Sequence, residues 1–270
     1  MVGKERALGI CEAGISASGA DAAEAVLMSE ADSLTRFANS EIHQNTTVDD
    51  ATLFVRVVLG TREGWASANQ ITRDAVQEAA RRAAEMARVQ PETPDFPGLA
   101  DPAECEESDG YDERTATFTP AERAHAVSRI IRQADAHGLN ASGSLRTRTM
   151  EVAVANSRGV SAWARGTDAS LITVMMTGFE SDAGSGYAEA ASKRVGDLDF
   201  EALGATAVRK CLAAANPGDV EPGEYVVVLD IVRRGQELRE RAVGDESNVG
   251  DGHDRRRLAR PRYLAAAIRL

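Results

Sequence analysis

The sequence has few of the residues from which metal sites and catalytic sites are usually built. Its 270 residues include four histidines and three cysteines, and aromatic residues make up only 4% of the chain. No His-Glu-x-x-His, Cys-x-x-Cys, Gly-x-Ser-x-Gly or Walker A motif is present, although zinc, nucleophile and phosphate sites commonly carry such motifs. We therefore assign no catalytic, cofactor-binding or metal-ligating residue to this chain.

Long apolar runs are missing as well. No stretch approaches the roughly 18 apolar residues of a membrane span. Glu12 interrupts the short apolar run at the N-terminus, which we read as the start of a helix and not as a secretory signal. Cys11, Cys105 and Cys211 are odd in number and far apart, which disfavours a disulfide framework. We expect a cytoplasmic protein without a membrane anchor, in which Cys211 is a buried residue of a helix.

The formal net charge of −11 is unevenly distributed. Residues 231–270 hold ten arginines and six acids, a charge of +4, whereas residues 1–230 hold 21 basic and 36 acidic groups, a charge of −15. Because phosphate binding needs basic surface, the acidic part makes nucleic acid an unlikely main partner. We interpret the Arg-rich segment as a solvated tail, and DNA binding through it is the least favoured reading.

The histidines offer no complete ligand set. His43 has Glu41 as its one neighbouring ligand, which is too few for zinc. His253 lies in the sequence Gly-Asp-Gly-His-Asp, which we interpret as a polar loop. His125 and His137 belong to one predicted helix, where the first lies off the apolar stripe and the second lies in the last turn. Both are expected to be structural or exposed.

Two parts of the chain resemble each other at an offset of 117 to 118 residues. Ala-Asn-Ser recurs at 38–40 and 155–157, and Asp-Ala-Thr-Leu at 50–53 recurs as Asp-Ala-Ser-Leu at 168–171. Each copy continues through an aromatic strand, GWASAN or GYAEAAS, into a helix that stops at a proline. Gly184 and Gly186 fall in a predicted hairpin and lack a third glycine, so they do not indicate a nucleotide-binding site. The pattern indicates a diverged duplication.

Local signals predict the elements of each copy. Alternating apolar residues predict a strand over 51–59. In the first copy the helix follows a cap at Thr72, and in the second it follows Asp199 or Asp197. A capping box at 119–122 opens a further helix.

These signals predict an α+β fold made of two copies of an antiparallel-strands-then-helix unit. The first copy spans residues 1–92, and an acidic, Pro-rich linker spans 93–118. The second copy spans 119–230 and ends in a β-branched run at 224–230, which we predict to be a buried strand. Residues 231–270 form the Arg-rich tail.

The sequence of one segment resembles that of a known protein family. Residues 34–45, Leu-Thr-Arg-Phe-Ala-Asn-Ser-Glu-Ile-His-Gln-Asn, resemble the N-terminal domain of the TldD/PmbA family, once called modulators of DNA gyrase. The resemblance covers roughly residues 5–230, because further blocks occur in the family's order: FVRVVLGTREGWASAN, FPGLADP, NSRGVSAWARGTDASL, SGYAEAASKRVGDLD and AANPGDVEPGEYVVVLD. It implies the fold of that N-terminal domain. The segment RFANSEIHQN is more similar to the PmbA-type subunit than to the TldD-type subunit.

The resemblance implies a cytoplasmic, zinc-dependent peptidase system of two subunits that acts on small or unfolded peptides. In such proteins a His-Glu-x-x-x-His helix in the C-terminal domain of the TldD-type subunit binds the metal, and its glutamate serves as general base for a metal-activated water. This sequence lacks that motif, so no ligand is carried over. Zinc is expected in a full-length TldD-type partner.

The resemblance ends after residue 230, where family members continue into a large C-terminal domain. Together with the reversal of charge, this leads to the hypothesis that residues 231–270 result from a frameshift or a truncation. The favoured reading is a metallopeptidase subunit that is not catalytic alone and pairs with a TldD-type subunit or with itself. The alternative is a non-enzymatic binding or assembly module. In the first case, strands near 33–68 or 150–190 are predicted to hold an extended peptide by strand addition.

Overall fold

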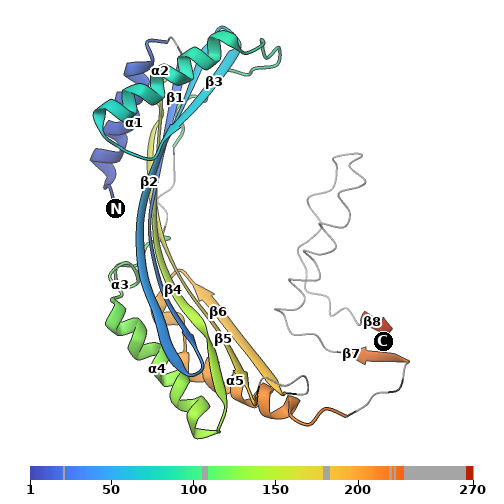
Figure 1. Cartoon of the computed structure of the whole chain (residues 1–270). Helices are drawn as coiled ribbons and strands as arrows, with labels where there is room; N and C mark the ends of the chain where they lie inside the picture. Colours follow the sequence, from blue (N-terminus) through green and yellow to red (C-terminus); the bar gives the residue numbers. More distant parts are fainter. Residues whose placement is uncertain are drawn as a thin grey trace. The chain divides into compact units, whose positions relative to one another are not determined.

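The computed structural model of the chain (Figure 1) consists of two units, Met1–Asn216 and Pro217–Leu270. The residues that the structure describes are 1–20, 22–104, 109–178, 183–218, 221, 223–227 and 266–269. Of these, residues 224–227 and 266–269 are described by their backbone alone. Cys105, His253 and most of the Arg-rich tail therefore lie outside the described residues. Within the described residues, no helix is long and apolar enough to cross a membrane.

The first unit combines a six-stranded sheet with helices, and the second contains one pair of short strands. The elements of the first unit are α1 (Lys4–Ser18), β1 (Ala22–Ala38), β2 (Glu41–Leu59), β3 (Arg62–Ala68), α2 (Arg73–Val89), α3 (Glu113–Ala116), α4 (Pro120–Ala136), β4 (Asn140–Asn156), β5 (Ser161–Met176), β6 (Ser185–Ser192), the 3-10 turn η1 (Val195–Asp197) and α5 (Phe200–Ala214). The elements of the second unit, which pair antiparallel, are β7 (Glu224–Val227) and β8 (Ala266–Arg269).

The sheet has the strand order β3-β2-β1-β4-β5-β6, and every neighbouring pair is antiparallel. The series α1-β1-β2-β3-α2 is repeated as α4-β4-β5-β6-α5, and the two copies meet where β1 pairs with β4. This arrangement has an approximate two-fold axis normal to the sheet, near the point where Asp32 lies opposite Arg148. The predicted α+β fold, with two copies of a strands-then-helix series, is confirmed. Each copy also begins with a helix, α1 or α4.

Both helix pairs cover the same face of the sheet, at its two ends (Figure 1). The long central strands contribute to both cores, since odd-numbered residues of β1 and β4 point to this face throughout. Leu27 and Ala153 belong to the core under α1 and α2, whereas Phe37 and Leu145 belong to the core under α4 and α5. Between the two cores the same face carries buried polar residues: Ser29, Thr35, Thr147, Thr149, Glu151 and Thr167.

A glycine in each edge strand allows a helix to approach the sheet closely. A Cβ atom on Gly64 would lie 2.1 Å from the carbonyl oxygen of Ala83 in α2. A Cβ atom on Gly186 would lie 2.0 Å from the carbonyl oxygen of Ala207 in α5. Any side chain at either position would therefore push the helix away from its strand. The sequence GYAEAAS thus carries a packing glycine in a hairpin strand.

Caps and turns agree with the local sequence. Thr119 and Glu122 form the predicted capping box of α4, and Thr72 accepts a hydrogen bond from the Ala75 N–H at the start of α2. Asp199, and not Asp197, caps α5. Asn39 and Ser40 both have positive φ, 53° and 58°, as a two-residue turn between β1 and β2 requires.

Other elements differ from the predictions. The strand predicted at 51–59 begins at Glu41, because residues 41–50 also form strand, although all of them except the half-buried Gln44 are exposed. The predicted linker 93–118 contains the short helix α3. The predicted strand at 224–230 is present over Glu224–Val227, and its last three residues lie outside the described residues.

The glycine contacts generate a stability prediction. Replacing Gly64→Ala or Gly186→Ala should lower the free energy of unfolding by roughly 1–3 kcal/mol, because the new methyl group overpacks the strand–helix contact. Denaturant unfolding followed by circular dichroism measures this loss. Gly9→Ala in α1 is the control: its Cβ would meet nothing within 4 Å, so stability should stay unchanged or rise. Equal behaviour of all three variants would contradict the close approach.

A second prediction concerns Cys11, a fully buried residue of α1. Burial raises the pKa of this thiol from 9.0 to about 11. The folded chain therefore keeps the thiol protonated at pH values where the unfolded chain ionises it. Its contribution to stability is complete below pH 9 and is lost as the pH rises towards 11, by up to about 3 kcal/mol. Unfolding free energies measured between about pH 8 and 10.5 should fall less steeply for Cys11→Ala, and parallel pH curves would refute the assignment.

Candidate functional site

The face of the sheet opposite the helices is open, and ion pairs cross it between neighbouring strands. The Nε atom of Arg146 donates a hydrogen bond to Asp32 over 2.7 Å. The Nε atom of Arg148 donates to Asp168 over 2.7 Å, and Nη1 of Arg148 lies 3.9 Å from Glu30. These pairs join β1, β4 and β5 near the approximate two-fold axis, so the middle of the open face is polar and charged.

The same face exposes apolar side chains towards one end. Met28, Phe54 and Trp65 are 50%, 39% and 54% exposed. They come from β1, β2 and β3, and the guanidinium of Arg56 lies 4.9 Å from the ring centre of Trp65. Because large apolar side chains gathered on a surface commonly mark an interaction site, this end of the open face is a candidate contact surface.

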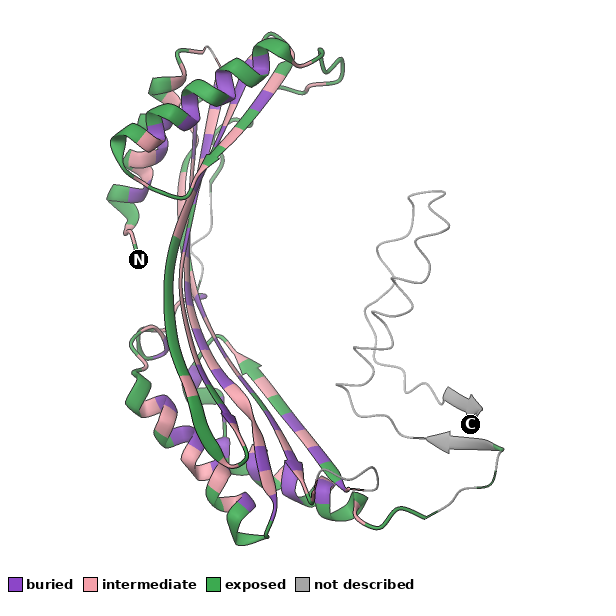
Figure 2. Ribbon diagram, viewed as in Figure 1, coloured by how far each residue is buried: buried purple, intermediate pink, exposed green. Residues whose placement is uncertain are grey.

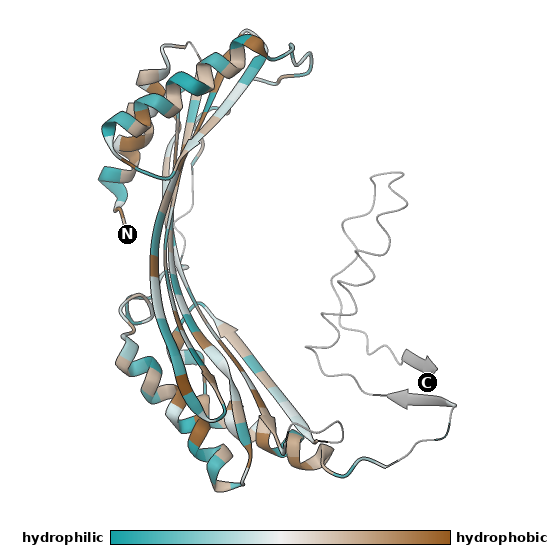
Figure 3. Ribbon diagram, in the orientation of Figure 1, coloured by the Kyte–Doolittle hydropathy of each residue, from teal (hydrophilic) through white to brown (hydrophobic). Residues whose placement is uncertain are grey.

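The most unusual feature is the outer edge of β2. Strand β3 pairs only with Leu53–Leu59 of β2, so β2 has β1 on one side over residues 45–50 and no partner on the other among the described residues. Figure 2 shows this part of β2 as a long exposed stretch, and Figure 3 shows that it is mostly hydrophilic. We call residues 45–50 the free edge.

The equivalent edge in the second copy is covered by the chain itself. Strand β6 pairs only with Ala169–Met176 of β5. Beyond that point Thr167 donates its backbone N–H to the carbonyl oxygen of Gly110 over 2.9 Å, and Asp112 donates its N–H to the hydroxyl of Thr167 over 3.0 Å. The guanidinium of Arg165 lies 3.6 Å from the ring centre of Tyr111. At the repeat offset of 118 residues, Thr167 corresponds to Asp49 of the free edge.

This correspondence gives the direction of the backbone groups on the free edge. N–H and C=O groups of alternate residues point to the same side of a strand. Since the N–H of Thr167 points away from β4, the two-fold relation directs the N–H groups of Asn45, Thr47 and Asp49 away from β1. The free edge therefore presents a row of donors and acceptors that an extended chain could pair with.

A buried arginine connects the free edge to α4. The Arg123 side chain is 1% exposed and donates hydrogen bonds to the hydroxyl of Thr35, the carbonyl oxygen of Phe118 and the amide oxygen of Asn45, over 3.1, 2.7 and 3.0 Å. Burial lowers the pKa of Arg123 from its ordinary value. These bonds hold α4, β1 and β2 together beneath the free edge.

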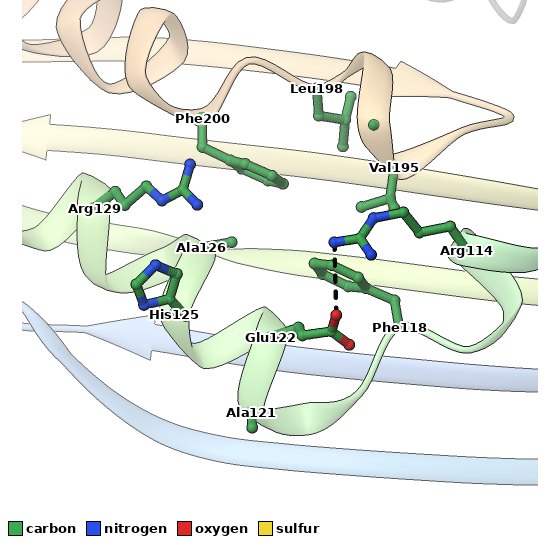
Figure 4. Close-up of a pocket in the computed structure, with 11 residues that line it drawn as sticks. Arg114, Phe118, Ala121, Glu122, His125, Ala126, Arg129, Val195, Leu198 and Phe200 are labelled. Carbon is green, nitrogen blue, oxygen red and sulfur yellow. Dashed lines mark ion pairs between the residues drawn. The ribbon is translucent and has the colours of Figure 1, made fainter.

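A cavity of about 440 Å³, which we call the α4 cavity, lies between α4 and the segment that follows β6 (Figure 4). Arg114 Nη2 lies 3.6 Å from Glu122 Oε1 on one side, and Arg129 and His125 lie on the other. The lining residues are Arg114, Phe118, Ala121, Glu122, His125, Ala126, Arg129, Val195, Gly196, Leu198 and Phe200.

The histidines remain apart in the structure. His43 is exposed in β2, His125 is exposed on α4 as predicted, and His137 follows the end of α4 with Nδ1 2.8 Å from the carbonyl oxygen of Gln133. Among the described residues no three His, Cys, Asp or Glu side chains are close enough to hold a metal ion. The described residues therefore do not fit a zinc ion, which the resemblance implies for a TldD-type partner, and we derive no step through it.

The α4 cavity is a site that no sequence motif indicates. Its residues come from α3, α4, the segment between them, the segment after β6 and the first residue of α5, and Arg114 lies in what was predicted to be a linker. Cys211 is fully buried on α5, as predicted.

Two family models match the chain. One, described as PmbA/TldA metallopeptidase domain 1, matches residues 23–87, and the other, described as the PmbA/TldA metallopeptidase central domain, matches residues 106–215. Together they cover most of the first unit. The chain belongs to the PmbA/TldD metallopeptidase family. A search of curated proteins finds no match.

Solved structures share the fold. TldE from Thermococcus kodakarensis has a TM-score of 0.71 at 20% identity, covering 80% of this chain and 49% of that one. A protein described as a modulator of a DNA gyrase from Thermotoga maritima has a TM-score of 0.67 at 13% identity, covering 76% and 47%. A similarly described protein from Bacteroides thetaiotaomicron has a TM-score of 0.72 at 18% identity, covering 88% and 56%. The chain spans about half the length of these proteins.

Proposed function

We propose that this chain is the peptide-holding part of a PmbA/TldD-family metallopeptidase, of the PmbA type, which is not catalytic alone. It acts in the proteolysis of small or unfolded peptides, and a TldD-type subunit supplies the zinc site. Membership of the family supports a role in proteolysis. The free edge of β2 is the observation that supports peptide binding by this chain. The proposed partner is that subunit or a second copy of this chain.

Strand addition at the free edge is the proposed mode of binding. An exposed strand edge that is not blocked is a template for pairing with another chain, and backbone pairing suits a protein that accepts many peptide sequences. The segment containing Gly110 covers the equivalent edge in the second copy, which supports extended chain as the occupant. Because the edge of the second copy is covered in this way, the proposed binding site is the edge of the first copy, within the predicted range 33–68.

The charges beside the free edge favour basic peptides. Glu30, which lies 3.9 Å from Arg148, is directly opposite Asp50 on the open face, and Asp50 has no ion pair among the described residues. Like charges placed opposite each other destabilise a sheet. Asp49 adds a further carboxylate on the other face. A lysine or arginine in the added strand would offset this repulsion.

The test uses proline at two adjacent positions of β2. Thr47→Pro removes an N–H that points away from β1, so the sheet should remain folded, whereas binding of an extended lysine-containing peptide should weaken about tenfold or more. Thr46→Pro removes an N–H that bonds to β1 and should lower the thermal midpoint instead. Thr47→Val keeps the N–H and should bind as the natural chain does. Fluorescence anisotropy with a labelled peptide measures binding.

A second experiment tests the proposed role in proteolysis. The chain mixed with a TldD-type subunit that carries His-Glu-x-x-x-His should cleave the same peptide in a zinc-dependent reaction, and Thr47→Pro should reduce that cleavage. Unchanged peptide binding by Thr47→Pro would refute strand addition at the free edge. Assembly of the two subunits without any cleavage would refute the peptidase role and favour a binding or assembly module.

A further inference from the structure

We propose that the α4 cavity binds a monoanionic carboxylate that carries an apolar group, such as the C-terminal residue of a peptide or a free carboxylic acid. The cavity volume of about 440 Å³ lies in the range of roughly 300–1,000 Å³ that is usual for small-ligand sites. This site lies on α4 and the segment after β6, and it does not depend on strand addition at the free edge.

The positive charge of the cavity is centred on Arg129. The side chain of Arg129 forms no hydrogen bond or ion pair within the part of the chain that the structure describes. Figure 4 shows its guanidinium group beside the ring of Phe200, with the imidazole of His125 below it. An arginine can bind a carboxylate through two parallel hydrogen bonds, and the imidazole can add a donor. Arg129 is therefore the proposed anchor of the carboxylate.

The other charged residues of the cavity favour an anion of single charge. Glu122 accepts hydrogen bonds from the backbone N–H and the hydroxyl of Thr119, each over 2.8 Å, and these bonds lower its pKa. Its carboxylate thus remains ionised and is paired with Arg114 at 3.6 Å. One uncompensated arginine beside a carboxylate suits a monoanion, whereas a phosphate dianion would be repelled by Glu122.

The remaining wall of the cavity is apolar. Val195, Leu198 and Phe200 are buried at 2%, 5% and 8% exposure, and Phe118 lies opposite them beneath the guanidinium of Arg114, 5.8 Å from its ring centre. Phe118 is only half-buried, so an apolar group joined to the carboxylate would pack against it and remove mainly its exposed surface from water. Small hydrophilic acids lack such a group, so they should bind less tightly.

Hydrogen bonds hold the walls in place before a ligand arrives. The backbone N–H of Val195 donates to the hydroxyl of Thr115 over 2.7 Å, and Asp112 in turn accepts from that hydroxyl over 2.7 Å. On the opposite wall the buried Arg123 holds the carbonyl oxygen of Phe118 at 2.7 Å. Because a preformed site loses little conformational entropy on binding, this geometry favours a real ligand site over a transient surface depression.

The experiment compares four probes by isothermal titration calorimetry with the full chain. The probes are an acetylated tripeptide ending in leucine with a free carboxylate, the same peptide amidated, 4-methylpentanoate and acetate. Amidation should weaken binding about tenfold or more, since it removes the charge that pairs with Arg129. Acetate should bind more weakly than 4-methylpentanoate. The tripeptide binding more tightly than 4-methylpentanoate assigns the site to peptide C-termini, and equal affinity assigns it to free carboxylic acids.

Three variants separate the site from general effects on the fold. Arg129→Gln should weaken binding of the free-acid probes about tenfold, and Arg129→Lys should weaken it less. Arg132→Gln is the matched control, because Arg132 lies on the same helix outside the cavity and its Nη1 donates to the hydroxyl of Ser128. Equal binding of the free and amidated tripeptides, or unchanged binding by Arg129→Gln, would overturn the proposal. Thermal midpoints of the three variants confirm that each remains folded.

Discussion

The pairing of β1 with β4 is the constraint on which the rest of the fold depends. The register runs without interruption from Glu24 opposite Asn156 to Phe37 opposite Gly143. Because the two strands are antiparallel and keep the same face towards the helices, each copy must extend its other strands outward, to β3 on one side and β6 on the other. The two copies thereby share one sheet, and their helices cover two separate cores on the same face of it.

The same pairing explains where the candidate sites lie. The strands near the two-fold axis are long enough to reach both cores, and neither helix pair covers their middle sections. In the second copy the segment ending at Asp112 lies along β5 and also leads into α3, which forms one wall of the α4 cavity. In the first copy no described segment lies along the free edge of β2, residues 45–50. The difference between two related halves thus produces an open edge in one and a cavity in the other.

Much of the fold could be predicted from the sequence, because local signals agreed with the tertiary structure. The capping box at Thr119, the alternation over 51–59 and the repeated Ala-Asn-Ser all correspond to real elements, and the second repeat of that tripeptide again lies at a hairpin turn. The long strands were missed in part because their middle sections carry threonine, serine and charged residues on both faces. Alternation of apolar and polar residues appears only where a helix covers the strand.

The candidate sites were less accessible to sequence reasoning. Strand addition was predicted for either copy, but whether an edge is covered depends on a segment more than fifty residues away in the chain, as the bond between Gly110 and Thr167 shows. The α4 cavity combines Arg114, Arg129 and Phe200 from three separate elements, each of which is ordinary in its local context. Only the tertiary structure brings an arginine that has no partner among the described residues to an apolar wall.

Hydrogen exchange of single amides in the unliganded chain tests the central claim, that one copy has an open edge where the other is covered. The amides of Thr46 and Val48 should be protected by β1, and those of Thr47 and Asp49 should exchange quickly, giving an alternating pattern along β2. The amide of Thr167, which corresponds to that of Asp49, should be protected by its bond to Gly110. Protection of Thr47 and Asp49 equal to that of Thr167 would contradict the open edge.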